Sequence, residues 1–370
     1  MIIRAKTDSL FTRAPISEQR KSNTALNLQE QQSGATILKS KPQRIILELT
    51  NACNINCIMC GRNASEFKLT SMKYEWFEKL IPIFSETEEV TLMGWGEPTV
   101  HPRFVDMLRE CHNHGIRKYF CTNGMKLDEL HDIIFETEVE VFAVSLDGID
   151  AKTNQVYRAG LDFERVINAL KTIVDTKSKN KLSYPHINFV MTVRKSNIEQ
   201  LPDMVDLAAD IGLNEVKAVI MTVFNNEQLI ENLWNEQELV NRCFKEAEKR
   251  ASASGVLLKL PYKQGDDVAG DMLHKDCYAP WRDLFLRSDG YTTLCMHTPV
   301  KLFHIDKYTD FDSMWNSNEY IDERMRVNDA NQMDDACKRC YHSTFTNWNK
   351  PYAYNQMGNL FSPEWEKEQE

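Results

Sequence analysis

The chain has 370 residues, a formal net charge of −10 at pH 7 and 42% hydrophobic residues, which suits one large domain with appendages. No apolar run approaches the roughly 18 residues of a membrane-spanning helix, and no apolar signal-peptide core opens the chain, so we expect a cytoplasmic protein without membrane contact. The acidic balance and the absence of a long Lys/Arg cluster disfavour nucleic acid as a partner.

The first segment, residues 1–40, is polar and rich in Gln, Ser and Asn. Such a composition predicts a flexible arm or a small docking element. The segment is too short and too polar for an independent peptide-recognition domain.

Strand and helix patterns alternate over residues 41–225. The expected strands are 44–49, 89–93, 117–122, 139–145, 186–193 and 215–221, and the expected helices are 73–86, 102–114, 126–136, 162–178 and 198–211. This alternation favours parallel strands joined by right-handed crossovers. Six such units predict an α/β fold, a partial (β/α)6 version of the eight-unit barrel, with its chemistry at the carboxyl ends of the strands.

Three cysteines follow the first expected strand. Cys53, Cys57 and Cys60 have the spacing C-x3-C-x2-C. Thiolates so close in one loop can converge on one metal cluster, and soft thiolates select zinc, copper(I) or iron–sulfur clusters. Three thiolates leave one iron of a four-iron cluster open to a small molecule. The alternatives are a zinc loop and three unrelated core cysteines.

Three more segments lie at later strand ends, residues 93–98 (MGWGEP), 122–124 (TNG) and 144–148 (VSLDG), and a fourth, 157–160 (YRAG), precedes the next expected helix. Together with the cysteine loop, they make the chain resemble the radical S-adenosylmethionine (SAM) superfamily over residues 44–225. Met59 departs from the pattern, because many relatives have an aromatic residue before the third cysteine.

The resemblance implies that a 4Fe–4S cluster on Cys53, Cys57 and Cys60 binds SAM and reductively cleaves it to a 5′-deoxyadenosyl radical, which abstracts hydrogen from the substrate. The residues expected to contact SAM are Gly94, Gly96 and Glu97 at its amino group, Ser145 at its ribose or carboxylate, Arg158 at its carboxylate, and Asn123 at the rim of the same site. A surface ion pair is the alternative for Arg158, and a turn role is the interpretation for Asp147.

Residues 226–262 read as a charged helical linker, in which Gly255 stops the helix and 256–260 form a short strand, and residues 263–345 carry a second cysteine group. Cys277 and Cys295 flank an expected hairpin over 284–295 (LFLRSDGYTTLC), and Cys337 and Cys340 form a C-x2-C pair. On spacing alone, a four-cysteine zinc site competes with an iron–sulfur cluster. The order of these residues resembles the twitch half of the SPASM extension. It implies an α+β auxiliary domain with one fully ligated 4Fe–4S cluster, hence two clusters in all, followed by a tail at 346–370.

Two further residues are candidates for catalysis. Cys121 ends a strand and would face the barrel interior, where it is a candidate hydrogen donor. His297, two residues past Cys295, is a candidate general base. Cys111 and Cys243 lie in helical patterns and read as core residues. Trp281, Arg282 and an aromatic tail form either a substrate wall or ordinary packing; the aromatic residues of this tail are Phe345, Trp348, Tyr352 and Tyr354.

The favoured function is a radical SAM oxidoreductase that oxidises a carbohydrate- or cyclitol-like alcohol, with the auxiliary cluster as electron acceptor. The alternative is peptide modification: a thioether link, a carbon–carbon link or epimerisation. A third possibility, a metal scaffold without enzymatic activity, predicts no SAM cleavage. The expected partners are a small-molecule substrate or a peptide and an external one-electron reductant of the flavodoxin or ferredoxin type.

Overall fold

The computed structural model describes residues 16–64, 68–223, 226–233, 235–261, 277–295, 298, 300–329, 331–334 and 337. The strands are β1 (Arg44–Leu47), β2 (Asn56–Cys57), β3 (Glu89–Leu92), β4 (Arg117–Thr122), β5 (Val141–Ser145), β6 (Arg158–Ala159), β7 (His186–Val193), β8 (Glu215–Ile220), β9 (Leu257–Lys259), β10 (Asp283–Leu286), β11 (Tyr291–Thr293) and β12 (Lys301–His304). The α-helices are α1 (Glu18–Ser33), α2 (Tyr74–Glu78), α3 (Phe104–Asn113), α4 (His131–Glu136), α5 (Ala151–Tyr157), α6 (Phe163–Lys179), α7 (Leu201–Ile211), α8 (Gln237–Ser254), α10 (Ala279–Arg282), α11 (Phe311–Trp315) and α12 (Asn318–Arg326). Short 3-10 helices lie at Gly61–Ala64, Ile81–Ile83, Pro98–Val100, Ile198–Gln200, Asn226–Glu231 and Ile305–Lys307.

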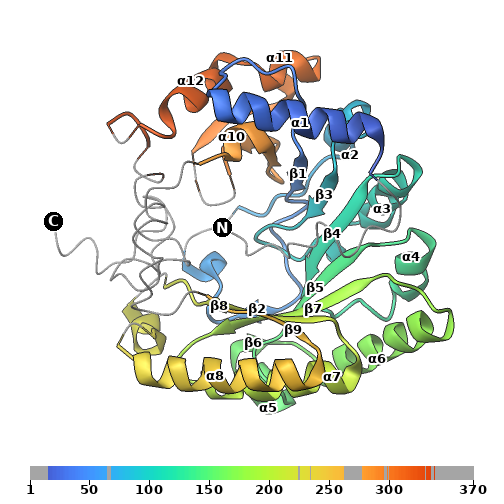
Figure 1. The fold of residues 1–370 in the computed structure, drawn as a ribbon, viewed down its shortest axis with the longest axis vertical. Coiled ribbons are helices and arrows are strands. Elements are labelled where there is room, and N and C mark those ends of the chain that lie inside the picture. The colour runs from blue at the N-terminus through green and yellow to red at the C-terminus, as the bar shows by residue number, and fades with distance from the viewer. Residues whose placement is uncertain are drawn as a thin grey trace.

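A curled sheet forms the centre of the molecule, and α3, α4, α6, α7 and α8 lie along its outside (Figure 1). Within the described residues this sheet has ten strands in the order β12-β11-β10-β1-β3-β4-β5-β7-β8-β9. The six predicted strands are all present and parallel, as the partial-barrel prediction requires. Their carboxyl ends therefore share one rim, which is where the predicted motifs fall.

The segment predicted as a linker, 226–262, is instead a further unit of the barrel. Helix α8 packs against α7, and β9 pairs in parallel with β8. The buried positions of α8 include Val240, Phe244, Ala247 and Ala251, spaced as one helical stripe. Gly255 ends the helix in the left-handed region, with φ +77°. The many charges of α8 occupy its outer face and hid this packing.

The prediction of a flexible arm is wrong for residues 18–33, which form helix α1. The polar side chains of this helix bind backbone groups of the rest of the protein. Asn27 is fully buried and donates to the carbonyl of Trp281 at 2.8 Å. Arg20 donates to the carbonyls of Phe84 and Thr87. The polar side chains of α1 therefore fix this helix on the barrel through hydrogen bonds to backbone groups. Residues 1–15 lie outside the described residues.

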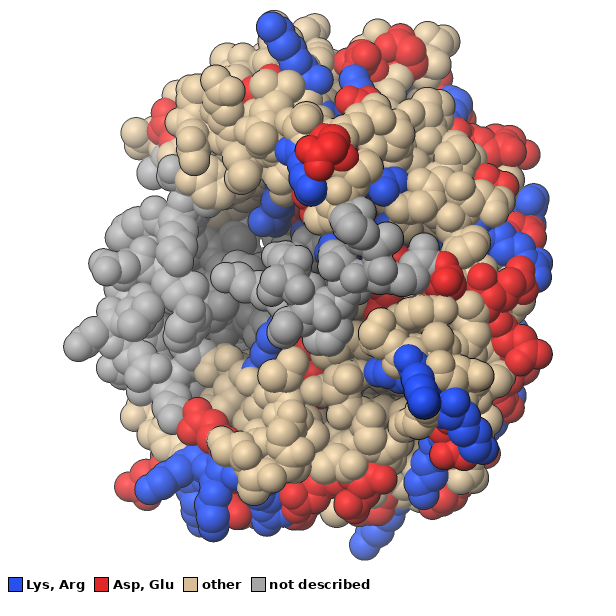
Figure 2. All heavy atoms as spheres, turned by 45° about the vertical axis from the view of Figure 1, so that its right-hand side comes forward, with Lys and Arg blue, Asp and Glu red and all other residues tan. Residues whose placement is uncertain are grey.

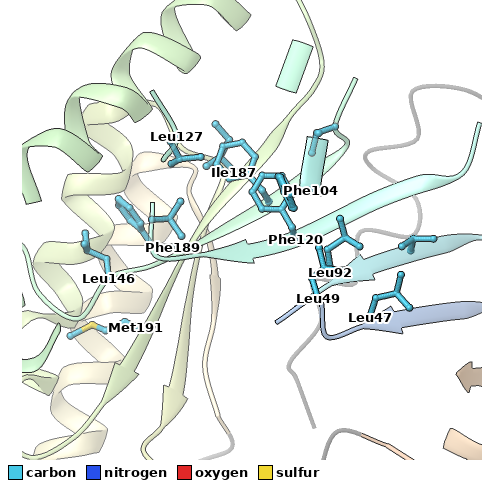
Figure 3. Close-up of a cluster of buried hydrophobic side chains, with 14 of the residues drawn as sticks. Leu47, Leu49, Leu92, Phe104, Phe120, Leu127, Leu146, Ile187, Phe189 and Met191 are labelled. Carbon is cyan, nitrogen blue, oxygen red and sulfur yellow. The ribbon is translucent and has the colours of Figure 1, made fainter. Parts of the chain in front are cut away.

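The main hydrophobic core lies between the sheet and its outer helices (Figure 3). Phe120 stacks on Phe142 with ring centroids 5.3 Å apart, and Phe104 meets Phe120 edge-on at 5.4 Å. The alternate residues of the same strands face the barrel interior, where Tyr119 and Ala143 belong to a separate buried cluster. Both faces of the central strands are therefore buried, which is typical of parallel sheets.

The predicted hairpin over 284–295 is confirmed: β10 pairs antiparallel with β11, and Gly290 adopts φ +83° in the connecting turn. The hairpin does not stand apart from the barrel, because β10 also pairs in parallel with β1. A buried ion pair joins the two strands, with Arg44 Nη2 2.7 Å from Asp283 Oδ2. Burial acts to raise the pKa of Asp283, but the charges of Arg44 and Arg282 bring it down to about 2.

The surface carries mixed charge. On the face shown in Figure 2, acidic and basic side chains of the described residues are interspersed. Among the described helices, none combines the length and apolar character that crossing a membrane requires.

Candidate active site

The cysteine loop leaves β1 at the rim of the barrel and is fixed by a small sheet. Its residues 56–57 form β2, which pairs antiparallel with β6, so that Cys57 lies opposite Arg158. The backbone N–H of Ile58 donates to Tyr157 at 3.0 Å, and that of Cys60 donates to Cys57 at 3.1 Å. The three cysteines of the loop are partly exposed. Backbone pairing therefore fixes this part of the loop against residues 157–159.

Two polar side chains reach the sulfur atoms. Asn123 Nδ2 lies 3.7 Å from Cys53 Sγ, and Arg158 Nη1 lies 3.8 Å from Cys57 Sγ. Burial raises the pKa of the Cys57 thiol to about 11, and Arg158 opposes this rise. Burial also raises the pKa of Cys60, to which the nearby Cys53 contributes. Donors aimed at sulfur stabilise the thiolate form that metal ligation requires.

The donor set suits a cluster rather than a single ion. Over the ranges that the structure describes, no three His, Cys, Asp or Glu side chains are close enough to hold one metal ion. In an iron–sulfur cluster, iron and sulfide ions stand between the thiolates, so the cysteines surround a larger group. Three soft thiolates with N–H donors at two of them fit that group.

Both glycines of the 93–98 segment allow close approach. A Cβ atom on Gly96 would lie 2.3 Å from the carbonyl oxygen of Ala52 and 2.4 Å from that of Thr50, both in the cysteine loop. A Cβ atom on Gly94 would lie 2.3 Å from Cγ of Glu48. The segment therefore packs directly on the cysteine loop, and the predicted contacts of Gly94 and Gly96 with SAM stay predictions.

Glu97 fixes this arrangement. Its carboxylate is 3% exposed and accepts hydrogen bonds from the N–H and hydroxyl of Thr99, the hydroxyl of Thr122 and the N–H of Asn123, the last at 2.7 Å. Four donors match the number that a carboxylate commonly accepts. In this structure Glu97 therefore ties the 93–98 segment to the end of β4, and its predicted contact with the SAM amino group stays a prediction.

Sequence reasoning missed a buried charge cluster beside Cys57. Asp147 is fully buried, with Oδ2 3.0 Å from Nε of Arg158 and 3.1 Å from Nη2 of Arg194. Arg194 also lies over the ring of Tyr157, 3.6 Å from its centroid. Arg158 is only 7% exposed, so the alternative of a surface ion pair is wrong. One carboxylate faces two guanidinium groups, and the excess positive charge favours an anionic ligand here.

The positions of Asp147 and Arg194 carried a signal that was available in the sequence. Asp147 follows β5, and Arg194 follows β7 directly. Charged residues at the carboxyl ends of barrel strands are candidates for function.

Cys121 faces the barrel interior, as predicted. Its Sγ lies 3.6 Å from Oγ of Ser145, and Met93 and Val190 pack in the same cluster. Burial raises the pKa of Cys121, which keeps the thiol protonated. Its role as a hydrogen donor and the contact of Ser145 with SAM stay predictions.

The other cysteines of the barrel are structural. Cys111 and Cys243 are buried in the core beneath α3 and α8, as expected. Met59, where relatives carry an aromatic residue, packs instead with Tyr157 and Met221.

The second cysteine group is described only in part. Cys277 is held by Asn328, which accepts from its N–H at 2.7 Å and donates to its carbonyl at 3.2 Å. Cys295 lies two residues past β11, and Cys337 packs at the edge of the main core. Cys340 and His297 lie outside the described residues. The ligand role of this group and the base role of His297 therefore stay predictions.

Trp281 is a packing residue in this structure, whereas Arg282 is 42% exposed, and its place in a substrate wall stays a prediction. Trp281 is 3% exposed and donates from Nε1 to the carbonyl of Ala35 at 2.6 Å. Arg282 pairs with Asp283. The aromatic tail lies outside the described residues.

Comparison with known proteins agrees with this geometry. Residues 47–228 match the radical SAM superfamily, and residues 277–341 match the SPASM iron–sulfur cluster-binding domain. The chain is 29% identical over 230 residues to the tungsten-containing aldehyde ferredoxin oxidoreductase cofactor-modifying protein of Pyrococcus furiosus, covering 59% of this chain and 62% of that protein. It is 23% identical over 354 residues to the AdoMet-dependent heme synthase of Methanosarcina barkeri, covering 88% and 96%.

A solved structure shares the fold. Streptococcus suis SuiB bound to precursor peptide SuiA superposes with a TM-score of 0.62 at 14% identity, covering 83% of this chain and 71% of that one. At this identity the likeness supports the barrel and its C-terminal extension as an architecture.

Proposed function

Because the chain belongs to the radical SAM superfamily and carries a SPASM iron–sulfur domain, we propose that it oxidises a C–H bond of a carbohydrate- or cyclitol-like alcohol. SAM and iron–sulfur clusters are its cofactors. In the proposal, one 4Fe–4S cluster serves SAM, and a second on Cys277, Cys295, Cys337 and Cys340 accepts an electron.

The chain's own residues prepare the first site. Cys53, Cys57 and Cys60 hold the cluster, and Asn123 and Arg158 direct donors at its thiolates. When bound, the cluster and SAM supply a carbon-centred radical that takes a hydrogen atom from an unreactive C–H bond. Such chemistry needs a rigid, dry site. Backbone pairing of β2 with β6 and the packing of Gly96 on the loop provide that rigidity.

The observation that best supports an electron-acceptor role is a buried carboxylate that connects the 93–98 segment to the hairpin of the C-terminal domain. Glu48 is 2% exposed. It accepts from the N–H of Trp95 at 2.9 Å and from the N–H and hydroxyl of Ser288, at 3.2 and 2.9 Å. An electron acceptor must keep a fixed distance from the reacting carbon, and this connection supports such a fixed relation.

The proposed reaction balances as follows. The carbinol carbon would lose a hydrogen atom and its hydroxyl group would lose a proton to a base; a cluster held by Cys277, Cys295, Cys337 and Cys340 would supply the acceptor for the remaining electron, so that a carbonyl group results. His297 is the proposed base. A flavodoxin- or ferredoxin-type protein is the proposed reductant for the first cluster, which agrees with a cytoplasmic location.

Peptide modification is the second candidate. The S. suis protein of this fold is described as bound to a precursor peptide. Solvent deuterium in the product distinguishes oxidation of a peptide from epimerisation. An epimerised residue gains a hydrogen from a donor such as Cys121, whereas an oxidised carbon gains none.

The test measures iron, sulfide and 5′-deoxyadenosine after anaerobic reconstitution. Wild type is compared with Cys277→Ala/Cys295→Ala and with the core control Cys243→Ala. About eight irons in wild type and in the control and about four in the double variant, with SAM cleavage kept, support the two-cluster mechanism. Four irons in all three proteins, with zinc lost only from the double variant, would refute the electron-acceptor role.

A further inference from the structure

Two rows of residues cross the barrel interior below the rim. Strand pairing aligns Cys121, Ala143, Asn188 and Glu215 in one row, and Ser145, Val190, Lys217 and Lys259 in the next row toward the rim. These rows run across β4, β5, β7, β8 and β9, which lie side by side in Figure 1. Asn188 lies beside Glu215 in the first row and Lys217 lies beside Lys259 in the second, while Ala143 and Val190 separate these pairs from Cys121 and Ser145.

Two of these polar side chains are buried without satisfied hydrogen bonds. Asn188 is 0% exposed and Lys217 is 1% exposed. Among the described residues, Nδ2 and Oδ1 of Asn188 have no hydrogen-bond partner, and Nζ of Lys217 has no hydrogen-bond acceptor. Groups buried in this way are rare and costly, so each requires an explanation. A bound ligand supplies one.

The charge of the cluster indicates which ligand. Glu215 Oε2 lies 2.9 Å from His186 Nε2, while Oε1 lies 3.7 Å from Lys217 Nζ and 3.4 Å from Lys259 Nζ. One carboxylate thus faces two ammonium groups. Lys217 also lies near the ring of Tyr119, with Nζ 6.0 Å from the ring centroid. Burial lowers the pKa of Lys217 to about 8, with Glu215 opposing this shift. This cluster of Glu215, Lys217 and Lys259 therefore carries one more positive than negative group.

We propose that Lys217 and Asn188 anchor an anionic oxygen group of the substrate, a carboxylate or a phosphate, inside the barrel. The inference rests on the proposed function and narrows its substrate to an alcohol that bears such a group. Ser145, at the proposed SAM site, lies in the same row as Lys217, with only Val190 between them. A ligand on Lys217 is thereby placed beside the reacting groups, while Arg158 and Arg194 remain at the cysteine loop for SAM.

The experiment measures ligand-dependent thermal stabilisation of the anaerobically reconstituted enzyme with SAM present. The probes are acetate, succinate and inorganic phosphate, with acetamide as the uncharged control and chloride at equal ionic strength. The variants are Lys217→Met, Lys217→Arg and Asn188→Leu, and Lys249→Met is the control because its side chain is 78% exposed. A ligand that binds the folded state raises the melting temperature with its concentration.

Stabilisation by carboxylates or by phosphate, but not by acetamide, is expected in wild type, Lys217→Arg and Lys249→Met. In Lys217→Met the concentration for half the effect should rise roughly 10- to 100-fold, as expected for a lost charged hydrogen bond. The probe that stabilises at the lowest concentration then indicates the anionic group of the substrate: acetate or succinate indicates a carboxylate, and inorganic phosphate indicates a phosphate ester. Asn188→Leu should weaken the response without altering the charge, which keeps the test open if Lys217→Met folds poorly.

Two results would overturn the inference. One is an equal anion response in wild type and Lys217→Met, which means surface binding. The other is a Lys217→Met enzyme that loses SAM affinity but keeps the anion response, because Lys217 would then serve SAM. Formation of 5′-deoxyadenosine is measured separately, so failure of the proposed radical chemistry remains distinguishable from failure of the anion site.

Discussion

Replacing Gly96 with alanine tests whether close packing of two loops positions the cluster cysteines. The added Cβ would lie 2.3 Å from the carbonyl oxygen of Ala52, 2.4 Å from that of Thr50 and 2.7 Å from the carbonyl carbon of Asn51. All three atoms are backbone, so no side-chain rotation relieves the contact. Gly96 does not have a positive φ, and alanine would therefore suffer from contact alone.

The magnitude follows from the distances. Restoring ordinary contact requires a shift of about 1 Å between the loops, and overpacking of this kind costs about 1–3 kcal/mol. The same shift breaks the hydrogen bond from the Glu97 N–H to the Ala52 carbonyl, now 2.9 Å, which adds about 1 kcal/mol. We expect a loss of about 2–4 kcal/mol in unfolding free energy. Displacement of a reacting group by about 1 Å reduces rates by about 100-fold.

Urea unfolding and the rate of 5′-deoxyadenosine formation, at matched iron content, measure the two effects. Gly255→Ala is the matched control: its φ of +77° penalises alanine, but no atom lies within 4 Å of the added Cβ, and the residue ends α8. The control should lose stability at unchanged rate per cluster. A Gly96→Ala enzyme with wild-type rate and less than about 1 kcal/mol lost stability would refute the packing argument.

Three further predictions concern buried charge. Glu97→Gln should lose about 1–3 kcal/mol in urea unfolding, because an amide nitrogen would face donors; an unchanged midpoint contradicts this. Asp147→Asn should cost about 3–5 kcal/mol by leaving Arg158 and Arg194 buried without a counter-charge, and a loss below about 1 kcal/mol argues against it. Because the Lys217 pKa is about 8 when folded and 10.5 in its ordinary state, the unfolded chain binds more protons between these values. The unfolding free energy of wild type should therefore rise by up to about 3 kcal/mol relative to that of Lys217→Met between pH 8 and 10.5. Parallel pH profiles of the two unfolding free energies would show that the pKa of Lys217 is not shifted.

Features encoded over short distances were predictable from the sequence. The hairpin is one case, since Ser-Asp-Gly between alternating apolar residues requires a turn, and Gly290 adopts the positive φ of that turn. The cysteine loop at the end of the first strand is another. Alternation of strand and helix patterns then placed the remaining motifs at one rim, because parallel strands share their carboxyl ends.

The strand-end positions of Asp147 and Arg194 marked them as candidates, but the partners of buried polar side chains were not predictable. Asp147 sits in a Leu-Asp-Gly sequence typical of a turn, and its role is set by Arg158 and by Arg194, which belong to later elements. Asn27 looks like a surface residue until the carbonyl of Trp281, 254 positions away, comes to lie beside it. Residue type indicates only the average burial of a side chain, whereas the burial of these side chains depends on hydrogen bonds and ion pairs with residues distant in the sequence.

The position of β1 explains why the cluster domain and the SAM site form one unit. This strand lies between β3 and β10, so the strand that leads into the cysteine loop is paired on one side by the barrel and on the other by the C-terminal hairpin. Glu48, just past β1, binds Trp95 from one side and Ser288 from the other. A displacement of the hairpin is therefore transmitted through the same backbone that carries Cys53. The C-terminal hairpin thus contributes to the geometry of the cysteine loop, in addition to belonging to a domain that matches an iron–sulfur cluster-binding family.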